Sequence, residues 1–331
     1  FKSQLPYNFT NLSIKIMSDA KTELLARIAW LYYVNKKTQE EIGNLFGLSR
    51  PSVQRHLNQA LDSRIVVTRI DHQQISQCME LSERICERFE LRQCDIAPSN
   101  SQTNLTEIRC NIEETGAQVM ERFIRKPESI TFALGSGATL RNCIDRIDCF
   151  NRPEHNVASL AGLTTPDGTQ SEFDLVTPFA NKTGARRYYF PFPLVLPSPE
   201  ERLALEGLTI YSVVEALASK ADISFVSISP LLIDSPFLRE GFMEKAELEK
   251  LIKTGACGEI LGQVFDEHGT IINSTFNERL AGVRIEPPTS RLIVGISGGS
   301  SKHRPILAAL RGQWINGLVT DEITARYLLE H

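Results

Sequence analysis

The stretch TQEEIGNLFGLSRPSVQRHLNQALDS, residues 38–63, decides how the chain is organised. Thr38 at its start and Glu41 three residues later form the capping-box pattern that begins a helix. Gly47 marks a turn. Ser49, followed two residues later by proline, marks the start of a second helix, because proline is tolerated in a first helical turn. The pattern therefore predicts two helices joined by a tight turn.

Both helices carry apolar residues at helical spacing, which predicts that these residues face inward. They are Ile42, Leu45, Val53, Leu57, Ala60 and Leu61. An ordinary helical hairpin would show the same spacing, but the second helix also has two arginines and no acid before Asp62, which favours a helix-turn-helix. Its polar face can reach phosphates and base edges from a major groove. The residues expected to contact DNA are Thr38, Gln39, Ser49, Arg50, Ser52, Gln54, Arg55 and Asn58.

The segments on either side complete a small domain. Apolar residues from Leu24 to Tyr32 predict a helix that packs behind the other two, and the β-branched run Arg64–Ile70 predicts a wing strand. Residues 21–72 are thus expected to form a winged helix-turn-helix, preceded by a mobile tail, residues 1–20. Residues 21–70 contain eight basic and four acidic side chains, or +4, whereas the whole chain carries −4, so the remainder sums to −8. This asymmetry is typical of a DNA-binding domain attached to an acidic body.

Composition narrows the remaining possibilities. A chain of 331 residues with 42% hydrophobic residues is long enough for two domains with their own cores. Its seven cysteines are scattered without a CxxC pair, which predicts reduced thiols and neither a disulfide framework nor a zinc site. No apolar run approaches the length of a membrane span, and the first sixteen residues lack the core of a signal peptide. We expect a cytoplasmic protein with no metal, no cofactor and no membrane partner.

Residues 73–92 are predicted to form a linker helix with one apolar stripe, made by Ile75, Cys78, Leu81, Ile85 and Phe89. The stripe has two possible partners, a second subunit or the following domain. We favour the second subunit, because palindromic operators are bound by dimers. The alternative is that this helix is the first core helix of the body.

Residues 93–331 alternate between strand and helix patterns, which predicts an α/β fold with a mostly parallel sheet covered on both faces. The predicted strands are Cys94–Pro98, Ser129–Leu134, Val157–Ala161, Ile223–Ile228, Gly258–Phe265, Arg291–Ser297 and Ile315–Val319. The predicted helices are Leu105–Arg125, one that begins within 135–140, Thr209–Ser219, His303–Arg311 and Asp321–Glu330.

Three loops after predicted strands carry small, hydroxylated or basic residues. In parallel sheets, ligands bind at such loops, and a helix N-terminus there attracts anions. The loops predict a pocket for a small, polyhydroxylated, anionic molecule such as a sugar phosphate. The candidate residues in them are Gly135, Ser136, Gly137, Ala138, Thr139, Gly162, Thr164, Thr165, Gly299 and Lys302.

Two further polar positions allow two interpretations each. Glu259 lies in an apolar strand, where it is either a ligand for sugar hydroxyls or an exposed residue on the solvated face. Arg186 and Arg187 lie in a predicted loop, where they either pair with phosphate or remain solvated.

These features together resemble a known family, the SorC family (SorC/DeoR-type) of sugar-binding transcriptional regulators. The residues that carry the resemblance are ARIAWLYYVNKKTQEEIGNLFGLSRPSVQRHL at 26–57, FALGSGATL at 132–140, GACGEILGQVFDEHG at 255–269 and GISGGSSKHRPILAALRGQWINGLVTDEITARYLL at 295–329. The resemblance implies a Rossmann-like effector domain related to phosphosugar isomerases and deaminases, a dimer or tetramer, and a sugar or sugar-phosphate inducer. It also implies that Gly135–Thr139, Glu259 and Lys302 line the effector pocket.

The sequence departs from the family pattern at two places. Glu259 stands where the family usually has aspartate, and Ser227-Ile228-Ser229 stands where relatives often have a Gly-x-Gly turn. The related enzymes need an acid and a base poised on the substrate. The loop after Ile228 contains Asp234 but no histidine, and His268 and His303 lie elsewhere.

We therefore expect a regulator without catalytic residues, which binds pseudo-palindromic operator DNA and a sugar, polyol or sugar-phosphate effector. The alternative is a catalytically active sugar-phosphate isomerase or deaminase.

Overall fold

A computed structural model describes residues 22–63, 65–66, 73–100, 102–169, 171, 174–232 and 235–331. The chain divides into two compact units, residues 1–71 (unit 1) and residues 72–331 (unit 2). Each is described by itself below.

Unit 1 contains a three-helix core. Residues 22–29 are helical and continue into the π-helical turn η1 (Trp30–Val34), followed by α2 (Gln39–Phe46) and α3 (Arg50–Asp62). The predicted capping box is present: the Thr38 side chain accepts from the Glu41 N–H, and the Glu41 side chain accepts from the Thr38 N–H. Gly47 ends α2 in the left-handed conformation, with φ of 66°. The buried side chains of the core are Leu25, Ile28, Ala29, Ile42, Val53, Leu57 and Ala60.

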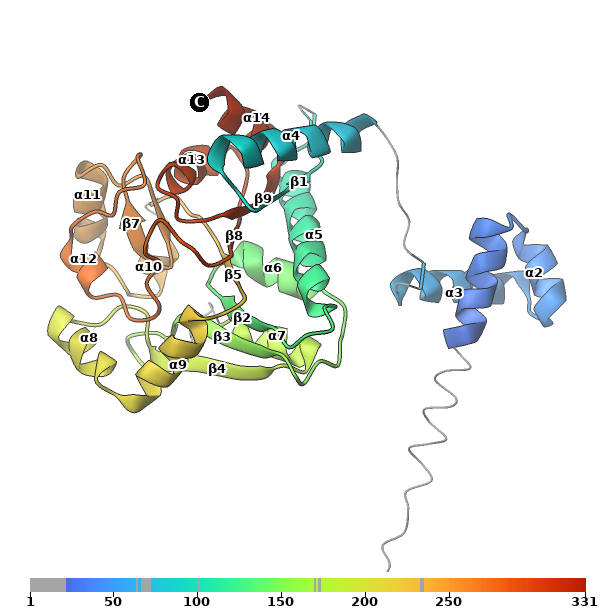
Figure 1. Ribbon diagram of the computed structural model, residues 1–331, viewed down its shortest axis with the longest axis horizontal. Coiled ribbons are helices and arrows are strands. Elements are labelled where there is room, and N and C mark those ends of the chain that lie inside the picture. The colour runs from blue at the N-terminus through green and yellow to red at the C-terminus, as the bar shows by residue number, and fades with distance from the viewer. Residues whose placement is uncertain are drawn as a thin grey trace, which may run out of the picture. The chain divides into compact units, whose positions relative to one another are not determined.

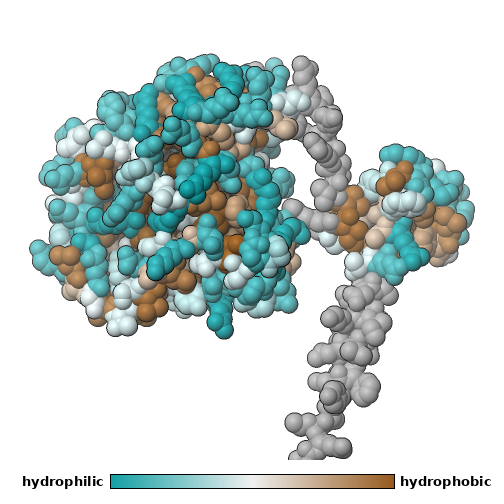
Figure 2. Space-filling view, viewed as in Figure 1, coloured by the Kyte–Doolittle hydropathy of each residue, from teal (hydrophilic) through white to brown (hydrophobic). Residues whose placement is uncertain are grey.

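The sequence predicted too many inward-facing residues in α2 and α3. Leu45 is 62% exposed and Leu61 is 38% exposed, because both lie at the edge of the apolar stripes of their helices rather than at the centre. Ser49 occupies the N-cap position of α3, but its side chain makes no capping hydrogen bond. In Figure 2 hydrophobic side chains reach the surface of unit 1. The predicted wing strand falls mostly outside the described residues.

Unit 2 is built on a parallel sheet. Among the described residues, seven strands pair in the order β1-β9-β8-β5-β2-β3-β4, and every pairing is parallel. The strands are β1 (Gln93–Ala97), β2 (Thr131–Leu134), β3 (Asn156–Thr164), β4 (Arg186–Pro193), β5 (Ile223–Val226), β8 (Ile293–Ile296) and β9 (Gly317–Asp321). A separate antiparallel pair is formed by β6 (Gly258–Ile260) and β7 (Gln263–Phe265).

Helices cover both faces of the sheet (Figure 1). On one face lie α5 (Leu105–Ile124), α6 (Ala138–Arg146) and α7 (Val176–Thr183). On the other lie α4 (Gln73–Phe89), α9 (Thr209–Ser219), α13 (His303–Arg311) and α14 (Glu322–Glu330). Successive residues of a strand point to opposite faces of the sheet, so that they are buried in two different hydrophobic cores. Phe132 and Leu134 of β2 are buried on the α5–α6 side, and Ala133 is buried on the other side.

The remaining helices are short. They are α8 (Pro199–Glu206), α10 (Pro236–Arg239), α11 (Lys245–Lys253), α12 (Thr275–Glu278) and the 3-10 turn η2 (Ser300–Lys302). A third, smaller apolar cluster lies under α10, α11 and α12 and includes Phe237, Leu248 and Phe276.

The helix α4 corrects a prediction. Cys78, Leu81 and Ile85 are buried in the main core of unit 2, where α4 packs on β1 and α14. The expected docking of this stripe on a second subunit is therefore wrong, and the alternative, that α4 is a core helix of the body, is right. The sequence left both possibilities open because an apolar stripe shows that a helix face is buried but does not show which surface covers it.

Two other local predictions were wrong, and three helices were missed. The run Gly258–Phe265 is a hairpin, because Leu261 and Gly262 both adopt positive φ and reverse the chain. Arg186 and Arg187 are exposed residues of the edge strand β4 rather than of a loop. The helices α7, α8 and α11 were not predicted, and each has at most nine residues.

Candidate effector pocket and DNA-binding surface

The topology creates a crevice between β2 and β5. From β2 the chain continues to β3 and β4 on one side, whereas β5 leads to β8 and β9 on the other. In parallel α/β sheets, this reversal of strand order separates the loops at the carboxyl ends of the two central strands and leaves a binding crevice. The loop after β2 and the loop after β5 therefore become the two walls of one site.

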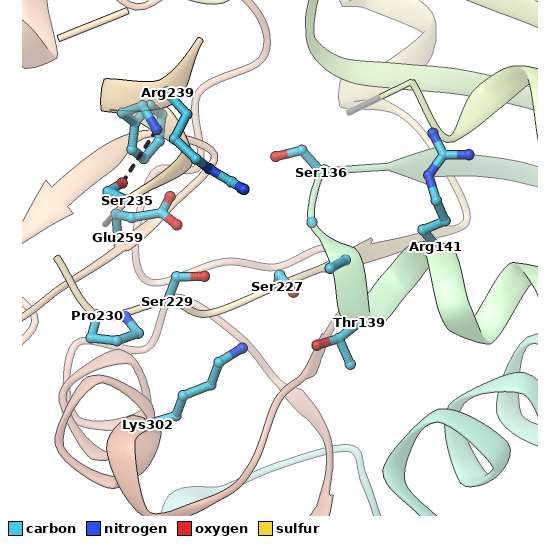
Figure 3. A pocket seen from close by; sticks show the side chains of 13 residues that line it. Ser136, Thr139, Arg141, Ser227, Ser229, Pro230, Ser235, Arg239, Glu259 and Lys302 are labelled. Carbon is cyan, nitrogen blue, oxygen red and sulfur yellow. Dashed lines mark hydrogen bonds between the residues drawn. The ribbon is translucent and has the colours of Figure 1, made fainter. Parts of the chain in front are cut away.

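A cavity of about 450 Å³ occupies this position. In Figure 3 Ser136 and Thr139 lie on the α6 side, Glu259 and Arg239 on the opposite side, and Lys302 extends toward the space between them. The residues that line the cavity are Ser136, Gly137, Ala138, Thr139, Arg141, Ser227, Ser229, Pro230, Ser235, Phe237, Arg239, Glu259 and Lys302.

Gly137 allows the two walls to approach closely. It precedes α6 with φ of 123° and ψ of 151°, a conformation that is essentially restricted to glycine. A Cβ atom there would lie 2.9 Å from Ser227 Oγ and 3.0 Å from Ser227 Cβ. The helix N-terminus has no side-chain cap, so its first N–H groups are available to an anion in the cavity.

Glu259 is buried, with 9% of its surface exposed, so it is not on a solvated strand face. Its backbone pairs with Ser229, and its Oε2 accepts a hydrogen bond from the Gly262 N–H over 2.9 Å. Burial raises the pKa of the Glu259 carboxyl to about 7, although the Gly262 N–H, the Ser229 side chain and the positive charge of Lys302 act in the opposite direction. The carboxyl can therefore exchange a proton near neutral pH.

The cavity carries more positive than negative charge. Burial lowers the pKa of the Lys302 ammonium, and the nearby Glu259 partly offsets this. Arg141 is occupied, since its Nη2 donates to the Asp174 carbonyl over 2.6 Å. Neither Arg239 nor Lys302 has a side-chain hydrogen bond or ion pair within 4 Å among the described residues. The lining thus contains three basic side chains and one carboxyl, and Arg141 keeps its charge although it is held by a backbone carbonyl.

The structure brings together some of the residues predicted to bind the effector. Ser136, Gly137, Ala138, Thr139, Glu259 and Lys302 line the cavity. Gly135 lies just behind it, since its N–H donates to the Phe225 carbonyl over 2.8 Å in the sheet. The N–H of Gly299 is bonded to Asp321, away from the lining residues.

The loop after β3 does not line this cavity. Strand β3 continues to Thr164 and includes Gly162, where a side chain would collide with the backbone of Phe192 and Pro193 on β4. Thr165 uses its hydroxyl within its own turn, to Asp167 and Thr169. Gly162, Thr164 and Thr165 lie beyond β2, on the side opposite β5, and the strand order responsible could not be read from the sequence.

Sequence reasoning also missed lining residues. In the sequence Ser227 and Ser229 stand out only as a departure from a Gly-x-Gly pattern, and no motif marks Arg141 or Arg239. The available signal was position, because residues 227–239 directly follow a buried strand, where ligand-binding loops occur.

In unit 1 the predicted DNA-contacting residues occupy the ends and outer face of α3 and the start of α2. Thr38, Ser49, Arg50, Gln54, Arg55 and Asn58 are exposed, and Gln39 and Ser52 are half-buried. Gln54 bridges the two helices: it accepts from Gln39 Nε2 and donates to Asn58 Oδ1 over 2.9 Å. A surface hollow beside this face is lined by Lys36, Lys37 and Arg50 among others.

The part of the chain that the structure describes contains no group of three or more histidine, cysteine, aspartate or glutamate side chains arranged to hold a metal ion. None of its helices is both long and apolar enough to cross a membrane.

Comparison with known proteins gives consistent results. Residues 73–330 match the family described as "Putative sugar-binding domain". The erythritol catabolism regulatory protein EryD of Brucella abortus is 27% identical over 313 residues, which cover 95% of this chain and 98% of EryD. The transcriptional regulator LsrR of Enterobacter sp. is 29% identical over 316 residues, 93% of each chain. The crystal structure of the full-length sorbitol operon regulator SorC of Klebsiella pneumoniae superposes with a TM-score of 0.73 at 23% identity, covering 93% of this chain and 98% of SorC.

A helix-turn-helix unit joined to a parallel α/β unit with a polar pocket at its switch point defines a ligand-responsive transcriptional regulator. The chain belongs to the SorC family of sugar-binding transcriptional regulators. The curated relatives are named as transcriptional regulators and not as enzymes, which agrees with the regulator interpretation rather than with the enzymatic alternative. Asp234, the acid that the enzymatic alternative required, lies outside the described residues.

Proposed function

We propose that this regulator controls a carbohydrate or polyol catabolic operon and that a phosphorylated sugar or polyol in the pocket changes its affinity for operator DNA. The observation that carries the proposal is the excess of cations in the cavity: among the described residues neither Arg239 nor Lys302 has a side-chain hydrogen bond or an ion pair, and Glu259 is the one carboxyl in the lining. An anion would satisfy both cations, and the open N-terminus of α6 adds donors.

The other polar groups suit a polyol chain. Ser136, Thr139, Ser227 and Ser229 offer hydroxyls that can donate or accept, and Glu259 accepts hydrogen bonds when ionised. A cavity of about 450 Å³ is large enough for a small phosphorylated sugar. EryD is named for erythritol catabolism and SorC for the sorbitol operon, which makes erythritol, sorbitol and their monophosphates the first compounds to test.

For DNA binding we propose that α3 enters a major groove, with Arg50, Ser52, Gln54, Arg55 and Asn58 toward the DNA. Gln39, Thr38 and Ser49 would then lie beside the phosphate backbone. The Gln39–Gln54–Asn58 hydrogen bonds hold this polar face in one arrangement before binding. Such preorganisation reduces the side-chain ordering that binding requires.

We further propose that the protein acts in the cytoplasm as a dimer or tetramer on a pseudo-palindromic operator. Two half-sites need two recognition helices related by symmetry. Cys78, Leu81 and Ile85 of α4 are buried within unit 2, so the proposed subunit contact uses other residues.

The test is a fluorescence anisotropy titration of the full chain with DNA from upstream of its own gene, at one stated salt concentration because phosphate contacts make affinity salt-dependent. The titration is repeated with erythritol, sorbitol, their monophosphates and inorganic phosphate. We expect a monophosphate to change operator affinity at least about tenfold, within the usual range of allosteric coupling. A response to the free polyols alone would contradict the anionic effector. DNA binding without any response would contradict the pocket assignment.

A further inference from the structure

The loop that carries Lys302 is hydrogen-bonded to the start of the last helix. The Gly299 N–H donates to Asp321 Oδ2 over 2.9 Å and to Thr324 Oγ1 over 3.1 Å. The Gly299 carbonyl in turn accepts from the Lys302 N–H over 2.9 Å. Gly299 therefore links the backbone of Lys302 to the Asp321 side chain through its own N–H and carbonyl groups.

Asp321 joins two elements with its two oxygens. It is fully buried, ends β9 and is the N-cap of α14. Its Oδ1 accepts from the Thr324 N–H over 2.9 Å, which is the bond that a helix cap requires. Its Oδ2 accepts from the Thr324 hydroxyl over 2.5 Å and from Gly299. The cap alone does not need the bond to Gly299, so the second oxygen specifically ties the pocket loop to α14.

The loop is also packed tightly against this carboxylate. At Gly298 even a Cβ atom would collide with Asp321 Oδ2. Close packing of this kind makes neighbouring elements shift together rather than deform independently. A displacement of Lys302 by a bound ligand would thus reach α14 through backbone and side-chain contacts.

From α14 the contacts continue to α4. Ala325 and Leu328 share the buried core with Leu81 and Ile85 of α4. Arg88 Nη1 donates to the Leu329 carbonyl. Figure 1 shows α4 lying beside α14. Helix α4 begins at Gln73, directly after the boundary between the two units, so it is the element that leads into the DNA-binding unit.

We propose that Asp321 is the coupling residue of this regulator: through its bond to Gly299 it makes the effector loop and the α14–α4 pair move as one body. This inference rests on the proposed function, because it presumes that the effector contacts Lys302. A ligand changes an equilibrium only by its different affinity for two states. The Asp321–Gly299 bond is what would extend that difference beyond the pocket.

The substitution Asp321→Asn separates the two roles of Asp321. Asparagine is a good N-cap, so its single oxygen can still accept from the Thr324 N–H. The NH₂ group of the asparagine then takes the place of Oδ2 and faces the Gly299 N–H. Because both groups are donors, the hydrogen bond to Gly299 is lost. The matched control is Thr324→Val, which removes the Thr324 hydroxyl and its bond from the Gly299 N–H but leaves the bond between Gly299 and Asp321 in place.

The experiment measures two quantities on each full-length variant: the affinity for erythritol 4-phosphate and the change that this compound causes in operator affinity. We expect Asp321→Asn to bind the compound within about fivefold of wild type, and its operator response to fall from at least about tenfold to below about threefold. Thr324→Val should respond like wild type. Because coupling is reciprocal, operator DNA should shift effector affinity by the same factor in wild type and hardly at all in Asp321→Asn.

Other outcomes overturn the inference in distinguishable ways. A full operator response in Asp321→Asn overturns the coupling role and leaves the proposed function intact. An equal loss of response in Thr324→Val assigns the effect to the start of α14 as a whole rather than to the Asp321 carboxylate, and also overturns the role. If erythritol 4-phosphate and the other panel compounds fail to bind wild type, the proposed function fails and the coupling role fails with it.

Discussion

Replacing Glu259 with glutamine should stabilise unit 2, and more so at alkaline pH. Burial keeps the pKa of the Glu259 carboxyl at about 7 in the folded protein, against 4.5 when it is solvated. The folded state therefore holds its proton more tightly than the unfolded state does. Stability from this group is greatest below pH 4.5 and is lost as the pH rises toward 7.

The magnitude follows from linkage. A pKa difference of this size makes the wild-type carboxyl cost about 1 kcal/mol of folding free energy at pH 5 and about 3 kcal/mol at pH 8, at about 1.36 kcal/mol for each pH unit between the two pKa values. Glutamine is neutral throughout and can still accept from the Gly262 N–H. Glu259→Gln should thus raise the free energy of unfolding by about 1 kcal/mol at pH 5 and about 3 kcal/mol at pH 8.

The assay is urea denaturation at both pH values, followed by tryptophan fluorescence in a Trp30→Phe background. The chain has two tryptophans, and only Trp314 lies in unit 2, where it is 1% exposed. Its fluorescence then reports unit 2 alone. Glu278→Gln, at an exposed position, is the control and should change stability at neither pH.

Two results would refute this reasoning. The first is an equal effect of Glu259→Gln at pH 5 and pH 8, which would show that the carboxyl does not titrate between them. The second is a loss of stability that grows with pH, which would mean that the folded protein stabilises the ionised carboxylate instead.

Four further substitutions test the sites. Arg55→Ala should weaken operator binding and lower the salt slope by about 1, while effector affinity stays unchanged; an unchanged salt slope would remove Arg55 from the interface. Lys302→Ala should do the reverse and lower effector affinity about 10- to 100-fold, the usual range for a hydrogen bond to a charged group; equal loss of both activities in either variant would indicate misfolding. Arg239→Gln should weaken binding of a polyol phosphate but not of the free polyol, as measured by calorimetry, and an equal effect on both would show that Arg239 does not contact the phosphate. Gly137→Ala should destabilise unit 2 by about 1–3 kcal/mol in urea, because φ of 123° is strained for alanine; a neutral result would mean that the loop relaxes.

Much of the local structure could be predicted from the sequence. The capping box at Thr38, the left-handed turn at Gly47 and the helices Thr209–Ser219 and His303–Arg311 occur as expected. Each depends on contacts between residues a few positions apart, so neighbouring side chains are enough to specify it. The same holds for the Gly-rich turn into α6, whose place after a buried strand and before a helix could be predicted from its neighbours in the sequence.

What only the tertiary structure decided is which of these local features meet. The sequence marked three loops as equivalent candidates, but the strand order places the loop after β5, with Ser227 and Arg239, beside β2 and places the loop after β3 on the far side. It also buries the stripe of α4 in its own unit and reverses the chain at Leu261, so that Glu259 points into the cavity. The physical reason is that periodicity and capping report which faces need burial or hydrogen bonds, whereas the partner of each face depends on non-local packing of the whole sheet.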